Sequence, residues 1–105
     1  MTDVQRLLDV LGAAGVDFVV VGGVALVLRG SSRVTLDLDL CYAGEVAGVG
    51  AYAQVSAGSS ELVVGDTPIR VMDLDALERS KRAAGRAKDL LDLAEIAEIR
   101  RRLRE

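Results

Sequence analysis

The sequence predicts a single α/β domain of the α+β kind, in which a small mixed β-sheet is flanked by helices. Its 105 residues suit one hydrophobic core and are too few for two. Helical and strand-like patterns of apolar residues alternate along the chain, and no proline-rich linker divides it. Only 3% of the residues are aromatic although half are hydrophobic. We therefore treat residues 1–105 as one domain with a core of Val, Leu, Ile and Ala.

Hydrophobic periodicity places most of the elements. In chain order, they are a helix at residues 4–11, a strand at 18–21, a short helix at 24–29, a strand at 35–40, a hairpin at 61–71, and helices at 74–84 and 87–103. Residues 43–60 are small and glycine-rich, so the pattern leaves open whether they form a short helix or irregular structure.

Local signals justify the first elements. Thr2 is suited to cap the first helix, whose apolar residues recur at helical spacing until Gly12. The β-branched run at residues 18–21 predicts a buried strand, which Gly22-Gly23 ends. Strict alternation over residues 35–40 places three leucines on one face of a strand and Thr35, Asp37 and Asp39 on the other.

The second half has its own start and stop signals. Gly65 lies in the turn of the hairpin, Asp73 can cap the next helix, and Gly85 breaks it. The last helix ends in arginines, which suit the negative end of a helix dipole. Its predicted apolar face consists of Leu90, Leu91, Ala94, Ala97 and either Ile96 or Ile99.

Composition excludes several kinds of site. The chain has no histidine, which removes Ser-His-Asp and Cys-His catalysis and histidine-bound zinc. Cys41 is the single cysteine, so we expect a core residue and no intrachain disulfide. No apolar stretch is long enough to span a bilayer, and the N-terminus lacks the pattern of a secretory signal. These features predict a cytoplasmic protein that does not enter a membrane.

Asp37 and Asp39 are the strongest functional signal. Residues two apart on a strand project to the same side, about 6 to 7 Å apart at the backbone. Their carboxylates could converge on Mg²⁺ or Mn²⁺, which prefer oxygen ligands and substrate phosphates. The alternative is a solvated strand face, although aspartate is disfavoured in strands and the two charges repel each other.

Gly22-Gly23 lies between a predicted strand and a helix. Glycine allows a ligand to approach the backbone closely, and a helix N-terminus favours phosphate. The sequence matches neither a Walker loop nor G-x-G-x-x-G. The alternative interpretation is a tight turn that requires a positive φ.

The combination resembles the signature of the DNA polymerase β-like nucleotidyltransferase superfamily. Residues 19–40 read VVVGGVALVLRGSSRVTLDLDL, an apolar strand and Gly-Gly followed, after a spacer of thirteen residues, by Asp-x-Asp. Minimal nucleotidyltransferases and AbiEii-type toxin nucleotidyltransferases are the most similar, and residues 81–89 look like their Lys…Arg-x-Lys-Asp pattern. The resemblance covers residues 1–42 and 62–103.

The resemblance implies the nucleotidyltransferase fold and Mg²⁺- or Mn²⁺-dependent transfer of a nucleotidyl group from an NTP to a hydroxyl of RNA or protein. It also implies the toxin of a toxin–antitoxin pair, with an antitoxin as partner. In this interpretation Asp37 and Asp39 bind the metal and Lys81 neutralises developing charge. The implied nucleotide-binding residues are Gly22, Gly23, Arg33 and Arg86. The alternative for the basic residues is a solvated helix face, with Lys88 paired to Asp92.

One departure from the family bears on activity. Relatives carry additional residues with a third carboxylate between the Asp-x-Asp strand and the hairpin, whereas here only residues 43–60 intervene. Glu45, Glu61 and Asp66 are substitutes by position only. The alternative function is therefore an inactive module that binds nucleotide or a partner. A nucleic-acid-binding module rests only on the basic C-terminus. The shortening also predicts a homodimer, formed through the hairpin or the last helix.

Overall fold

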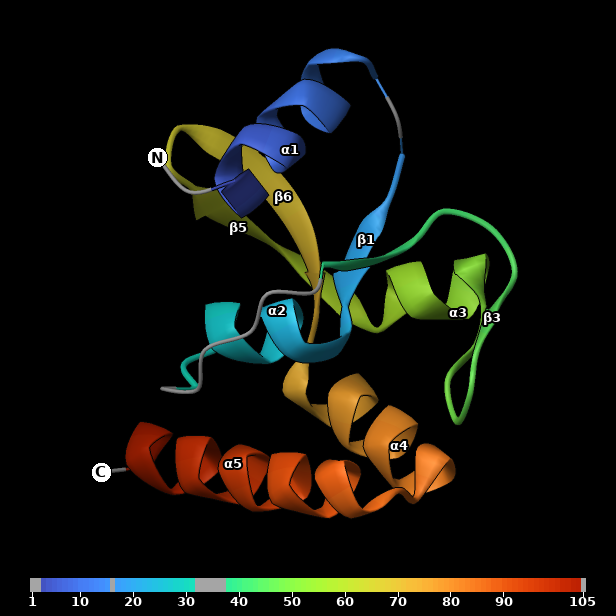
Figure 1. Cartoon of the computed structure of the whole chain (residues 1–105), viewed down its shortest axis with the longest axis vertical. Coiled ribbons are helices and arrows are strands. Elements are labelled where there is room, and N and C mark those ends of the chain that lie inside the picture. The colour runs from blue at the N-terminus through green and yellow to red at the C-terminus, as the bar shows by residue number, and fades with distance from the viewer. Residues whose placement is uncertain (1–2, 16, 32–37, 105) are drawn as a thin grey trace.

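The computed structural model of the chain describes residues 3–15, 17–31 and 38–104 (Figure 1). Its helices are α1 (Asp3–Ala13), α2 (Gly22–Leu28), α3 (Tyr52–Ala57), α4 (Leu74–Ala84) and α5 (Ala87–Leu103). Its strands are β1 (Val19–Val21), β2 (Asp39–Cys41), β3 (Glu45–Val46), β4 (Gly50–Ala51), β5 (Ser59–Val64) and β6 (Thr67–Met72).

Four strands form a mixed sheet in the order β2-β1-β6-β5. β1 pairs in parallel with β6 and antiparallel with β2, and β5 and β6 form an antiparallel hairpin. β3 and β4 pair in a separate two-stranded hairpin. The predicted α+β architecture with a small mixed sheet and flanking helices is confirmed at this level.

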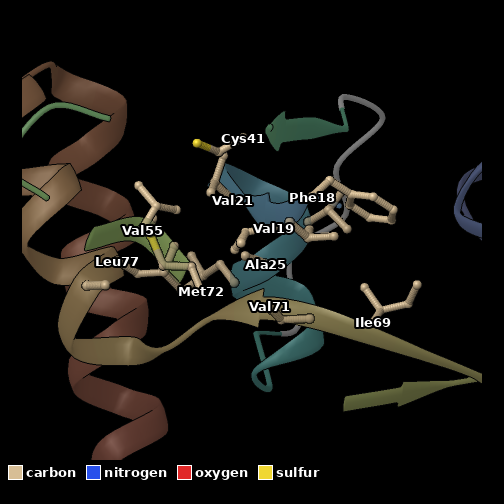
Figure 2. Packing of buried hydrophobic residues seen from close by; sticks show 14 of the residues in the cluster. Phe18, Val19, Val21, Ala25, Cys41, Val55, Ile69, Val71, Met72 and Leu77 are labelled. Carbon is tan, nitrogen blue, oxygen red and sulfur yellow. The ribbon is translucent and has the colours of Figure 1, made fainter. Parts of the chain in front are cut away.

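The core surrounds β1 and β6. Val19, Val20 and Val21 are all buried, and because successive side chains of a strand point to opposite faces, both faces of the sheet are covered. α2 packs against β1 and β2, whereas α3 packs against β5 and β6. Figure 2 shows Met72 of β6 and Leu77 of α4 among the buried side chains around β1, in the aliphatic core that the composition predicts.

The second half follows its local signals closely. The Asp73 carboxylate accepts a hydrogen bond of 2.9 Å from the backbone N–H of Ala76 and so caps α4. Gly85 ends the helix in the left-handed conformation at φ +63°. The hairpin of β5 and β6, the helix at 74–84 and the helix at 87–103 are therefore confirmed.

Two expectations change in the first half, and a segment that the sequence left open has defined elements. α2 begins at Gly22, so Gly22-Gly23 forms the first residues of the helix rather than a turn before it. α1 continues past Gly12 to Ala13, since a helical Gly costs only about 1 kcal/mol. Residues 43–60 contain β3, β4 and α3, which the buried side chain of Val55 anchors to the core. The predicted N-cap Thr2 and residues 35–37 of the alternating strand lie outside the described residues.

The predicted apolar face of α5 is wrong except at Ile96 and Ile99, which are buried, because Ala94 and Ala97 are exposed and so are both leucines. Leu90 and Leu91 are 63% and 62% exposed, whereas Asp89 and Asp92 are buried one turn apart on the face that meets the domain. The reason is electrostatic, because Lys81 of α4 lies opposite these aspartates and neutralises them. Among the described helices, none is long and apolar enough to cross a membrane.

Candidate functional site

The junction of β1 and α2 brings Gly22 against Asp39. Val21 is the register partner of Asp39 in the antiparallel pair of β1 and β2. A Cβ added to Gly22 would lie 2.6 Å from Asp39 Oδ2 and 3.3 Å from its Cβ, and Gly22 itself has φ +68°. A side chain at residue 22 would therefore be strained and would collide with the carboxylate. The predicted proximity of this glycine and Asp39 is confirmed.

The structure describes only part of the Gly-Gly and Asp-x-Asp motif within residues 19–40. Gly23 follows in the first turn of α2 and is partly buried. Asp39 is exposed, so its carboxylate is accessible to a ligand beside the glycine backbone. Asp37 and Arg33 lie outside the described residues, and the predicted side-by-side arrangement of the two aspartates stays a prediction.

A buried group of charged residues links α4 to α5. Lys81 Nζ lies 2.9 Å from Asp92 Oδ2 and 3.6 Å from Asp89 Oδ1. The Asp89 side chain is fully buried, and those of Lys81 and Asp92 are each 11% exposed. Asp92 therefore has Lys81 of α4 as an ion-pair partner. The predicted catalytic role of Lys81 stays a prediction, and the structure places its ammonium between two carboxylates.

Arg86 extends this group to the surface. Its Nε and Nη2 donate to Asp89 Oδ2 and Oδ1 at 2.8 and 3.3 Å, and its backbone N–H donates to Asp89 Oδ2 at 3.0 Å. These hydrogen bonds hold the pKa of Asp89 below its usual value, although burial acts in the opposite direction. The Arg86 side chain is 59% exposed, so one end of it is anchored and the rest is accessible.

The acidic residues around Arg86 stabilise its charged form. Its pKa is raised mainly by the hydrogen bond to Asp89 and by the charge of that residue, with smaller contributions from Asp92 and Asp39. The contacts that the structure gives the Arg86 side chain are those with Asp89, at the start of α5. Gly22 and Asp39, which the pairing of β1 and β2 brings together, form what we call the candidate site.

The three acidic residues considered as substitutes for a third carboxylate lie on other elements. Glu45 is exposed on β3, Glu61 is exposed on β5 opposite Arg70, and Asp66 lies in the turn between β5 and β6. Within the described ranges, no cluster of three or more acidic or cysteine side chains could hold a metal ion. Of the acidic residues that the structure describes, Asp39 is the one that lies against Gly22 in the candidate site.

The C-terminal arginines have structural partners. Arg100 Nη1 donates to Glu78 Oε1 at 2.8 Å and its Nη2 pairs with Asp75, which joins α5 to α4. Arg102 donates to the carbonyl of Gly30 at 3.0 Å. These contacts support the structural interpretation of the cluster and leave it outside the candidate site.

Sequence reasoning gave too little weight to Asp89 and Asp92. Both lie in a helix rich in charged residues, where a solvated carboxylate is the usual expectation. The available signal was their spacing of three residues, which places them on one helical face together with Ile96 and Ile99. Arg29 was also missed, and it holds the ends of β5 and β6 through their backbone and side-chain oxygens.

A hollow of about 500 Å³ lies elsewhere, between α2, the start of α4 and the end of α5. Its lining combines leucines with charged side chains, namely Leu28, Arg29, Leu62, Asp73, Leu74, Asp75, Arg100 and Leu103. Arg29 and Arg100 are already engaged in the structural contacts described above. Because no member of the candidate site borders this hollow, we assign it no part in the chemistry.

Comparisons with protein-family models, with curated proteins and with solved structures gave no match for this chain.

Proposed function

We propose that the chain is a Mg²⁺-dependent nucleotidyltransferase that transfers a nucleoside monophosphate from an NTP to a hydroxyl of RNA or protein. In this reaction the acceptor oxygen forms a bond to the α-phosphorus and the bond from that phosphorus to the bridging oxygen breaks. Pyrophosphate leaves with the electron pair, and the hydroxyl proton passes to water. The reaction class comes from the resemblance of residues 19–40 to the superfamily.

The contact between Gly22 and Asp39 is the observation that carries this proposal. The motif requires a glycine after one strand to lie beside a carboxylate of the next, and the two groups are in contact in the structure. Glycine leaves the backbone open to a phosphate at the place where an exposed carboxylate lies. Arg86 is an exposed arginine, which the resemblance assigns to the nucleotide, and a guanidinium suits a polyphosphate.

The residues present are compatible with a divalent cation. Mg²⁺ is usually held by one or two carboxylates together with substrate phosphates, and Asp39 is an exposed carboxylate of this kind. Asp37 would be the second ligand. The ion would neutralise charge on the phosphates. Asp39 orients the bound nucleotide beside Gly22, and Arg86 binds an oxygen of the triphosphate.

A second candidate function is nucleotide binding without transfer. It is favoured by the positions of Glu45, Glu61 and Asp66, because the described part of the chain contains no third carboxylate beside Asp39. Family members use such a group to complete the metal site or to activate the acceptor. A chain without this carboxylate could therefore bind the nucleotide without catalysing its transfer.

The test is incubation of the purified chain with Mg²⁺, total cell RNA and protein, and each NTP labelled at either the α- or the γ-phosphate. Nucleotidyl transfer places α-label on a macromolecule and releases γ-label as pyrophosphate. Asp39→Asn should abolish transfer, whereas Asp17→Asn, a change at another exposed aspartate, should leave it intact. Binding of Mg·NTP without transfer would support the second candidate, and labelling by Asp39→Asn at the wild-type rate would overturn the assignment.

A further inference from the structure

The strand β5 ends the four-stranded sheet. In the order β2-β1-β6-β5 it has β6 on one side, and no other strand of the described ranges lies on its second side. Such an edge presents backbone N–H and C=O groups that another strand can bind. Proteins commonly protect an edge strand by short length, lysine, proline or a bulge, whereas β5 runs for six residues in unbroken register and contains neither lysine nor proline. The free side of β5 is therefore suited to pair with another strand.

The register of the hairpin determines which residues face this free side. A two-residue turn joins β5 to β6, so the adjoining pair, Val64 and Thr67, is a hydrogen-bonded pair, as is every second pair after it. Glu61 and Val63 lie in the pairs between, and their backbone N–H and C=O groups point away from β6. The register partner of Val63 is Pro68, which has no N–H and fits a pair that exchanges no hydrogen bonds.

The side chains of β5 give this edge an apolar character on both faces of the sheet. Val63 is 71% exposed on the face that it shares with Glu61. Leu62 points to the opposite face, where it lines the hollow of about 500 Å³ together with Leu28 and Leu103. Leu103 is 72% exposed, so the apolar lining beside the free edge is in contact with solvent. A strand added to β5 would cover apolar surface as well as backbone.

We propose that two copies of this chain pair antiparallel through β5, about a two-fold axis at Leu62, and so join their sheets into one. In this register Glu61 of each copy lies opposite Val63 of the other, and the two residues exchange both of their N–H···O=C hydrogen bonds. Leu62 meets its own counterpart at the axis, next to the hollow that it lines. The same surface is used on both copies, as in most dimers. This interface does not depend on nucleotidyl transfer.

The edge is self-complementary in this register and in no neighbouring one. An axis at Glu61 would set that carboxylate opposite its own counterpart, and it would use the carbonyl of Ser59, which already accepts a hydrogen bond of 3.1 Å from a guanidinium of β6. An axis at Val63 would pair Glu61 with Gly65, which has φ +64° in the turn and cannot continue a ladder. The axis at Leu62 uses strand residues alone and sets each glutamate beside a valine. A second copy of the chain is therefore the partner that fits this edge.

Light scattering on the full chain at high micromolar concentration tests the interface, with circular dichroism as the check on folding. The wild type should have twice the monomer mass and Val63→Pro the monomer mass, because proline removes an N–H that only the second copy uses. Val63→Thr is the matched control, since it retains the N–H and the branched side chain, and it should remain a dimer. A monomeric wild type or a dimeric Val63→Pro would overturn the proposal. A dimer that Leu90→Glu with Leu91→Glu dissociates would also overturn it, because that dimer forms through α5.

Cysteine cross-linking tests the register and does not require the proline variant to fold. In Leu62→Cys the two thiols meet at the axis, in a pair whose Cα atoms lie about 4.5 Å apart, within the range of a disulfide. Mild oxidation should therefore link the two copies. In the control Val63→Cys the counterparts are diagonal neighbours roughly 7 to 8 Å apart, which is too far, and both variants retain the buried Cys41. Equal linking of the two variants, or no linking of Leu62→Cys, would contradict the proposed register.

Discussion

The carboxylate of Asp39 lies directly against the α-carbon of Gly22, so that a Cβ on residue 22 would be 2.6 Å from Asp39 Oδ2. Two segments that are separate in the sequence are thereby joined at one point. The contact depends on the pairing of β1 with β2, which sets Val21 opposite Asp39. It also depends on glycine, because residue 22 adopts φ +68° as α2 begins.

Gly22→Ala should lower the free energy of unfolding by more than Gly15→Ala does. Both glycines have a positive φ, +68° and +74°, so both substitutions incur a backbone cost of about 1 to 2 kcal/mol. Nothing lies within 4 Å of a Cβ at Gly15, whereas a Cβ at Gly22 meets Asp39. Urea denaturation of both variants measures the difference.

Combining Gly22→Ala with Asp39→Ala should recover the part of the loss that comes from the collision. The two glycine variants could instead be equally destabilised, or the double variant could recover no stability. Either result would show that the Asp39 carboxylate does not prevent a side chain at residue 22.

Acid should remove the stability that Asp89 contributes. Its pKa in the folded protein lies below the usual value because Arg86 donates to it, with Lys81 adding a favourable charge. This stability is complete above the unfolded-state pKa of about 3.9 and is lost as the pH falls through the lower folded-state pKa. Melting temperatures of the wild type and Asp89→Asn should therefore differ at neutral pH and converge at strongly acidic pH.

At neutral pH, removing one partner of a buried ion pair lowers the free energy of unfolding by about 3 to 5 kcal/mol. We expect Asp89→Asn to lower it by less than this, because Asp92 still pairs with Lys81. A difference in melting temperature that stays constant across the whole acid range would contradict the assignment. Asp17→Asn, at an exposed aspartate away from this group, is a control that should show little change.

Arg29→Ala should destabilise the fold by about 2 kcal/mol, the usual range for hydrogen bonds to a charged group. Its Nη2 donates to the carbonyl of Val71 at 2.6 Å and to Ser60 Oγ at 2.7 Å, and Nε donates to the carbonyl of Met72 at 3.1 Å. Arg29→Lys should restore little, because one ammonium cannot reproduce the fork. Denaturant unfolding measures both variants.

Arg82→Ala supplies the comparison, since Arg82 is exposed and its pair with Glu78 spans 3.8 Å. Such surface pairs contribute little. If Arg29→Ala lowers the free energy of unfolding as little as Arg82→Ala does, the hydrogen bonds from Arg29 to the hairpin do not contribute to stability.

We expect the chain to self-associate, with light scattering at high micromolar concentration giving twice the monomer mass. Leu90 and Leu91 on α5 and Val63 on the hairpin are large apolar residues with more than half of their surface exposed. Leu90→Glu with Leu91→Glu should dissociate a dimer formed through α5, and Val63→Lys one formed through the hairpin. A strict monomer in the wild type would refute the prediction.

Much of the local structure follows from the sequence. Asp73 and Gly85 mark the ends of α4 because an aspartate side chain satisfies a free N–H and glycine accepts the left-handed conformation. The valine run at β1 predicts a buried strand, and the alternation over residues 35–40 places Asp39 on the face opposite the leucines. Each of these features depends on residues close together in the chain.

The tertiary structure decided the rest. Leu90 and Leu91 have the spacing of a buried face, yet Asp89 and Asp92 occupy it because Lys81 comes from another helix to neutralise them. Helical periodicity records polarity along one segment and contains no information about a charge that a second segment supplies. The meeting of Gly22 with Asp39 was suggested by a motif, but strand pairing between β1 and β2 creates it, because the register that sets Val21 opposite Asp39 brings a carboxylate to a residue without a side chain.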